Sequence, residues 1–265
     1  AATIFVVHPL NTQAVTYIVQ RAAVLAALFY LFAIFAYLKA RLSTSGVSRT
    51  KWLAICAGTV FCALLSKQNA ATLPLSLLLV ELMFFQVSRK KMAVVGVLFF
   101  LQITVAVAII TSGWDIATRE DTVAATRSEY LAIQTQVLWH YIRLFAIPLG
   151  LRLEYEPPSP SSWGDTLVIL AAIAHLTVLG IALFFARKKP VPAFGVLFYY
   201  TANLIESSVL PIRDVAVEHR TYLPNVGLCI VVGWLVSELH ARYQNWRSAL
   251  GLATVVVVAV LLIMT

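Results

Sequence analysis

Eight apolar runs, each separated from the next by a polar connector, constrain the fold of this chain more than any other feature. They lie at about 22–38, 52–66, 70–87, 92–113, 166–186, 192–211, 223–239 and 248–264. About 20 apolar residues are needed for a helix to cross a bilayer, and tilting or local thinning accommodates other lengths. Only 12% of the residues are charged, against about 25% in soluble domains. The runs predict an all-α polytopic membrane protein, with about eight transmembrane helices in a single domain, 1–265.

Both ends of the sequence resemble parts of helices. The first residues, AATIFVVHP, lack the basic segment and cleavage site of a signal peptide. The last, TVVVVAVLLIMT, stop inside an apolar run. We therefore expect an internal piece of a longer protein.

The charged residues divide the connectors into two alternating kinds. Twelve of the 20 Lys and Arg residues lie in basic connectors, at 39–51, 88–91, 187–189 and 242–247. Ten of the 12 acidic residues lie in the other connectors. Because cytoplasmic loops carry an excess of Lys and Arg, the basic set is predicted to be cytoplasmic. The net charge of +8 is then a topology signal, and no nucleic-acid partner is expected.

The long connector 114–165 tests this alternation. Its segment 137–151, VLWHYIRLFAIPLGL, is apolar enough to resemble a span, but a crossing there would place the basic 187–189 connector outside. We predict instead an amphipathic or re-entrant helix at the extracytoplasmic surface. The acidic stretch 114–129 is expected to be a solvated helix or loop.

Ionisable residues near predicted helix ends form the candidate site, since charges at membrane depth are costly and usually mark a pathway, a partner or a site. Arg21 could hold a lipid phosphate through paired donors, or could extend its charge to the water boundary. Lys67 could bind an anion or be a solvated turn residue. Glu206 could act as a base or orienting group, or could pair with Arg213 or Arg220.

The densest group of charges lies in RDVAVEHRTYLP, residues 213–224. The imidazole of His219 has a reference pKa near 6.5, which suits proton transfer or phosphate binding. The alternative is a solvated loop with internal salt bridges, but five ionisable residues in eight favour a functional site. These five are Arg213, Asp214, Glu218, His219 and Arg220.

Several other functions lack sequence support. Cys56, Cys62 and Cys229 lie in apolar segments without metal-ligand spacing and are expected to be small buried hydrophobes. No nucleotide-binding or zinc motif occurs, so neither a metal site nor a cofactor is predicted, although a metal requirement stays open. His175, in mid-helix, is expected to pack between helices. A transporter would need charges at the bilayer midplane, whereas these cluster at one face.

Three stretches resemble a known family: HPLNTQAVTYIVQR (8–21), LLSKQNAATLPLSLLLVEL (64–82) and ESSVLPIRDVAVEHRTYLPNVG (206–227). They resemble bacterial membrane proteins with tetratricopeptide repeats, which in turn resemble the transmembrane-and-tetratricopeptide-repeat (TMTC) O-mannosyltransferases. YIRLFAIPLGLRLEYE (141–156) is similar more loosely. The resemblance implies a glycosyltransferase C-like fold that transfers sugar from a polyprenyl-phosphate donor to a protein or glycan acceptor on the periplasmic side of the bacterial inner membrane.

The resemblance matches Arg21, Lys67 and the group 218–220 to positions in family motifs. From charge and depth we predict donor-phosphate binding by Arg21, Lys67, Arg213, His219 and Arg220, with catalytic or orienting roles for Glu206, Asp214 and Glu218 and support from His8 and Tyr222. Gln13 stands where TMTC relatives often have Glu. The family's catalytic acidic residues are expected upstream of His8, and its tetratricopeptide repeats after the last helix.

Two functions therefore follow from the sequence. The first is a membrane glycosyltransferase whose substrate is a lipid-linked sugar donor. The second is a non-catalytic membrane subunit or scaffold of a larger complex that retains the fold.

Overall fold

The structure is a computed structural model and describes residues 1–85, 126–156, 162–207 and 214–265. In these ranges its regular secondary structure is entirely helical. The α-helices are α1 (Ala2–Val7), α2 (Thr12–Thr16), α3 (Arg21–Leu42), α4 (Gly46–Ser66), α5 (Leu73–Phe84), α7 (Arg127–Ala146), α8 (Thr166–Phe185), α9 (Pro190–Asn203), α10 (Asn225–Arg242) and α11 (Arg247–Met264). Short 3₁₀ helices are η1 (Pro9–Asn11), η2 (Ile18–Gln20), η3 (Gln68–Thr72), η4 (Glu218–Thr221) and η5 (Gln244–Trp246).

Four helical segments of the described residues are long and apolar enough to cross a membrane: Ile18–Leu42, Gly46–Ser66, Thr166–Phe185 and Gln244–Met264. The prediction of a helical membrane protein is thereby confirmed. The predicted spans 70–87, 192–211 and 223–239 overlap α5, α9 and α10, which fall short of those criteria. The predicted span 92–113 lies outside the described residues.

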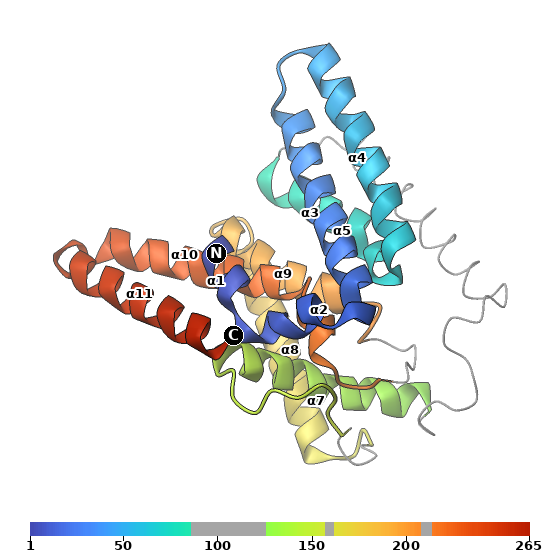
Figure 1. Cartoon of the computed structure of the whole chain (residues 1–265), viewed down its shortest axis with the longest axis vertical. Helices are drawn as coiled ribbons and strands as arrows, with labels where there is room; N and C mark the ends of the chain where they lie inside the picture. The colour runs from blue at the N-terminus through green and yellow to red at the C-terminus, as the bar shows by residue number, and fades with distance from the viewer. Residues whose placement is uncertain (86–125, 157–161, 208–213) are drawn as a thin grey trace.

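Two helical hairpins extend from a shared centre, α3 with α4 and α10 with α11 (Figure 1). Helix α3 buries many alanines, and small side chains let helix backbones approach closely in membranes. Tyr30 of α3 lies edge-on to Phe198 of α9, with ring centroids 5.9 Å apart. Its hydroxyl bonds Ser76 of α5 at 2.6 Å and Thr72 of η3 at 3.0 Å. One buried tyrosine thus links α3, η3, α5 and α9.

Helices α9 and α10 cross through a pair of glycines. A Cβ on Gly195 would lie 2.6 Å from the carbonyl oxygen of Gly227, and a Cβ on Gly227 would collide with the backbone of α9. Only glycine permits so close an approach. Glu206 follows α9, and η4 precedes α10. The crossing of α9 and α10 therefore fixes where the segment after α9 meets η4, and these two segments carry candidate site residues.

Helix α7 differs from the predicted 137–151 helix at both ends. It begins at Arg127, because Thr126 and Glu129 form a capping box that satisfies the first free N–H groups. It ends at Ala146, where Ile147 is extended before Pro148, as expected for a residue that precedes proline. Its buried residues include Tyr130, Gln134, Val137, Tyr141 and Leu144, so α7 is amphipathic with one face against the protein.

His175 of α8 is buried between helices, as predicted. Its Nε2 lies 2.9 Å from the Thr135 carbonyl oxygen of α7, and its Nδ1 lies 2.8 Å from the Tyr200 hydroxyl of α9. The imidazole therefore joins three helices and is not available for chemistry.

Candidate functional site

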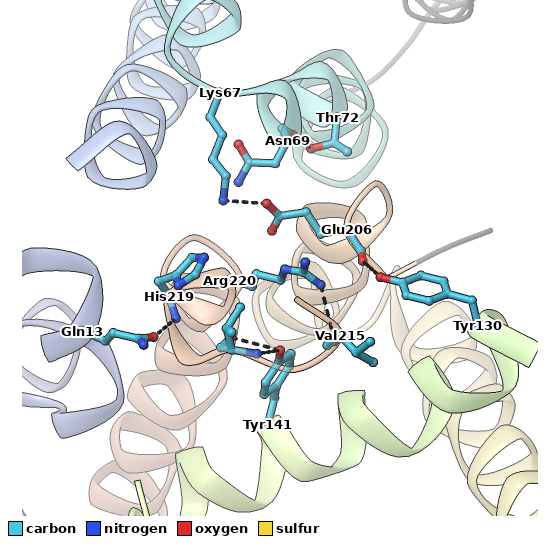
Figure 2. A network of polar contacts seen from close by, with 11 residues as sticks. Gln13, Lys67, Asn69, Thr72, Tyr130, Tyr141, Glu206, Val215, His219 and Arg220 are labelled. Carbon is cyan, nitrogen blue, oxygen red and sulfur yellow. Dashed lines mark hydrogen bonds and ion pairs between the residues drawn. The ribbon is translucent and has the colours of Figure 1, made fainter. Parts of the chain in front are cut away.

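The three stretches that carry the family resemblance meet in space (Figure 2). Gln13 Oε1 accepts a hydrogen bond of 2.7 Å from the backbone N–H of His219. Asn225 Nδ2 donates to Asn11 Oδ1 at 2.7 Å. Lys67, at the end of α4, reaches Glu206 after α9. The ends of α4 and α9 and the beginning of α10 thus surround one polar network.

Lys67 and Glu206 form the central contact. Lys67 has an extended backbone where α4 ends, so its side chain projects beyond the helix toward the turn after α9 (Figure 2). Its Nζ lies 2.6 Å from Glu206 Oε1, and the two side chains are 16% and 4% exposed. The interpretation of Lys67 as a solvated turn residue is therefore wrong. Glu206 pairs with Lys67 rather than with Arg220, and Arg213 lies outside the described residues.

Arg220 brings a second buried cation to the same network. Its guanidinium points toward Glu206 (Figure 2), and Nη1 donates to the Val215 carbonyl oxygen at 3.4 Å. Burial lowers its pKa, but neighbouring Tyr141, Glu206 and Tyr130 more than offset this, so the pKa is raised. Arg220 thus keeps its charge although it is only 4% exposed.

Two tyrosines of α7 hold the segments that carry these charges. The Tyr141 hydroxyl accepts from the N–H of Val217 at 2.9 Å and donates to its carbonyl oxygen at 3.0 Å. The Tyr130 hydroxyl donates to the carbonyl oxygen of Glu206 at 2.9 Å. Both hydroxyls thus bond buried backbone groups of the segments that carry Glu206 and Arg220.

His219 is buried beside the two cations as a neutral imidazole. Burial, together with the positive charges of Lys67 and Arg220, lowers its pKa to about 3. It can therefore donate or accept a hydrogen bond at neutral pH, but it supplies no positive charge to bind phosphate. Its Nδ1 is buried without a hydrogen-bond partner among the described residues.

Among the described residues the network carries more positive than negative charge. Lys67 and Arg220 are balanced there by one carboxylate, that of Glu206, while His219 is neutral. Three more buried polar atoms near these residues in the sequence also lack a partner among the described residues: Asn69 Oδ1, Asn203 Oδ1 and Ser207 Oγ. Because buried charges and polar groups need partners, this arrangement is suited to hold an anion that also bears polar groups.

Glu218 belongs to a neighbouring contact. Its Oε1 accepts hydrogen bonds of 2.5 Å from both the Arg152 N–H and the Tyr155 hydroxyl. Burial raises the pKa of the carboxyl group. Gln13 Nε2 donates to the Leu153 carbonyl oxygen at 2.7 Å. Glu218 therefore joins the segment after α7 to η4, and makes no ion pair within the described part of the chain.

Four predicted residues are not brought into the network. Arg21 is exposed at the beginning of α3, and Asp214 is partly exposed. His8 Nε2 donates to the Phe145 carbonyl oxygen at 2.9 Å, and its ring stacks on that of Phe145, so it connects the beginning of the chain to the end of α7. Tyr222 packs edge-on against Phe5. For His8 and Tyr222 the contacts are structural.

The sequence analysis assigned no role to Tyr130, Tyr141 or Asn69. For the tyrosines a signal was present. They lie eleven residues apart, about three helical turns, on the face of α7 that also carries Gln134 and Val137. Polar groups repeated along an otherwise apolar helix face indicate buried hydrogen bonds. Asn69 gave no such signal, because its environment depends on how η3 packs.

The donor set favours an anion rather than a metal. Among the residues that the structure describes, no group of three His, Cys, Asp or Glu side chains could hold a metal ion.

Comparison of the chain with protein-family models, curated proteins and solved structures finds no match.

Proposed function

We propose that the chain is a membrane glycosyltransferase domain that transfers a sugar from a polyprenyl-phosphate-linked donor to a protein or glycan acceptor outside the cytoplasm. One observation carries the proposal. Lys67 is paired with Glu206, and the charge of the buried Arg220 also interacts with that carboxylate, on the segments that resemble the TMTC family. The glycosyltransferase C-like fold, the bacterial inner membrane and a periplasmic site are parts of the same proposal.

The charges suit a phosphate that gains negative charge as the sugar leaves. The acceptor oxygen would form a bond to the anomeric carbon while the bond from that carbon to the phosphate oxygen breaks. Lys67 and Arg220 would stabilise the departing phosphate, since fixed cations in a water-poor site act strongly on developing charge. A neutral His219 could add a hydrogen bond.

Glu206 would have a second role in this reaction. A donor phosphate at Lys67 competes with the Glu206 carboxylate for the same ammonium group. Once displaced from Lys67, the carboxylate could accept the proton that the acceptor hydroxyl loses. We therefore propose Glu206, rather than Glu218 or Asp214, as the base supplied by the described residues.

A scaffold is the second candidate, and the Lys67–Glu206 contact itself favours it. At 2.6 Å and with little exposure, this pair can act simply as a buried link between α4 and α9. A scaffold would need the link but no lipid-linked donor.

Glycan transfer by the full-length protein in cells that lack their own copy tests the proposal. Lys67→Gln is expected to lower transfer at least roughly ten-fold, since a hydrogen bond to a charged group contributes about 1.5–3 kcal/mol. Lys189→Gln, in an exposed pair with Glu238, is the matched control and should leave transfer unchanged. Membrane abundance of each variant is measured in parallel. Unchanged glycosylation in a Lys67→Gln variant of normal abundance would refute the enzyme and favour the scaffold.

A further inference from the structure

A separate cavity lies at the other end of the α3–α4 hairpin. It is an open groove of about 500 Å³ where the end of α3 meets the beginning of α4. Both helices are candidate membrane spans joined by a short connector, so in a bilayer this end of the hairpin would lie at the level of the lipid headgroups. The cavity would then be open to lipid rather than to the polar network around Lys67.

The lining combines an apolar wall with one cation and two hydroxyls. Phe35, Leu38 and Trp52 contribute to the wall, with Lys39 beside them and Ser43 and Ser48 at the connector. The Lys39 Nζ lies 5.5 Å from the Phe35 ring centroid, and Phe35 and Trp52 meet edge-on at 5.9 Å. The Phe35 ring thus holds the Lys39 ammonium within the lining of the cavity.

Within the described residues no acidic side chain pairs with the cation of this cavity. The first acidic residue in the sequence is Glu81, and its carboxylate is bound by Arg41 at 2.8 Å and Tyr37 at 2.7 Å. Lys39 makes no ion pair within the described residues. Arg49 and Lys51 add two exposed positive charges close by, so the cavity lies in a positive field.

We propose that this cavity binds the phosphodiester headgroup of an anionic phospholipid. The Lys39 ammonium contacts the phosphate, while the Ser48 hydroxyl donates a hydrogen bond to one of its oxygens; the Ser43 hydroxyl donates to the Ser45 carbonyl oxygen at 3.2 Å. The acyl chains pass along Phe35 and Leu38 into the bilayer. A headgroup at this level binds where lysine is attracted to anionic lipid and where aromatic rings favour the interface. The proposal does not depend on any glycosyltransferase activity.

Lipid binding to the purified full-length protein, measured by native mass spectrometry in detergent, tests the proposal. Phosphatidylglycerol should bind more tightly than phosphatidylcholine. Lys39→Gln should weaken the binding of phosphatidylglycerol about five-fold, as expected for one lysine near an anionic surface. Ser48→Phe, which keeps the charge but fills the cavity, should weaken the binding of both lipids.

Lys51→Gln is the matched control, because it removes an exposed charge that does not line the cavity. It should change binding less than about two-fold. Equal losses for Lys39→Gln and Lys51→Gln would show general attraction and overturn the proposal. Equal binding of the two lipids would also overturn it, and so would complete displacement of phosphatidylglycerol by inorganic phosphate.

Discussion

Two buried carboxylates, Glu81 and Glu206, lie at opposite ends of the helices and differ in how they are balanced. Glu81 Oε2 accepts from Arg41 Nε at 2.8 Å and from the Tyr37 hydroxyl at 2.7 Å. The Arg41 guanidinium also lies 4.7 Å from the Phe85 ring centroid. This contact fixes α3 to α5 with one cation for one carboxylate, and its groups have partners.

Glu206, in contrast, has two cations near it, one more than a contact that only fixes helices together requires. Lys67 and Arg220 both approach it, and buried polar atoms without partners in the described residues lie near it in the sequence. A contact selected only for stability would not need the second cation. One cation already balances one carboxylate, and a buried charge without a partner costs several kcal/mol. The comparison teaches that the Glu81 contact is balanced, whereas the Glu206 contact, with a second cation nearby, is the one that we propose accepts a further anion.

The largest expected effect comes from neutralising each carboxylate. Glu206→Gln leaves Lys67 and Arg220 without a counter-charge and should lower the free energy of unfolding by about 3–5 kcal/mol. Glu81→Gln should cost a similar amount, since Arg41 loses its partner. Only the Glu206→Gln protein should regain stability when a polyprenyl phosphate is added, because only its two cations can bind the phosphate.

Thermal unfolding in detergent, with and without the lipid, checks this difference. Polyprenol, which lacks the phosphate, is the control ligand. Rescue of both variants, or of neither, would break the distinction between the two carboxylates.

Within one pH unit, a smaller effect is expected from His219. Its pKa is about 3 in the folded protein and near 6.5 when unfolded. Between these values the unfolded chain binds the proton and the folded chain does not, so stability falls as the pH is lowered from 6.5 toward 3. The loss should be at most about 1.4 kcal/mol per pH unit. Unfolding of wild type and His219→Gln across this range measures it; an identical pH dependence would show that His219 is not held neutral.

The smallest effect is expected at Lys189 and Glu238. Their charged atoms are 3.0 Å apart, but both side chains are about half exposed. Exposed pairs contribute only about 0–1 kcal/mol, so Lys189→Ala should change the free energy of unfolding by less than about 1 kcal/mol. A loss as large as that of Glu206→Gln would mean that burial does not determine how much each ion pair contributes to the free energy of unfolding.

The sequence predicts the apolar helices well because their signal is local. The predicted runs 52–66 and 166–186 end within a residue of α4 and α8. The beginning of α7 was placed ten residues too late, since the apolar run starts at 137 whereas the Thr126–Glu129 capping box begins the helix at Arg127.

The site could be predicted only in part. Sequence indicated that Lys67, Glu206 and Arg220 matter, because charges are rare beside apolar runs. It could not indicate that Lys67 is the partner of Glu206, since that contact depends on how α4 and α9 pack. Nor could it separate Arg220, which faces the network, from Glu218 two residues earlier, which binds the segment after α7. A 3₁₀ turn directs neighbouring side chains to different sides, and only the fold decides which side holds the charges.

Binding of a polyprenyl phosphate to the purified full-length protein tests the central claim most directly. Native mass spectrometry in detergent compares it with polyprenol for wild type, Lys67→Gln and the exposed-pair control Lys189→Gln. We predict that wild type and Lys189→Gln bind the phosphate-bearing lipid at least roughly ten-fold more tightly than the alcohol, and that Lys67→Gln weakens this preference. Equal affinity of the wild-type protein for the two lipids, or an undiminished preference in Lys67→Gln, would contradict the assignment of Lys67 and Arg220 as a phosphate site.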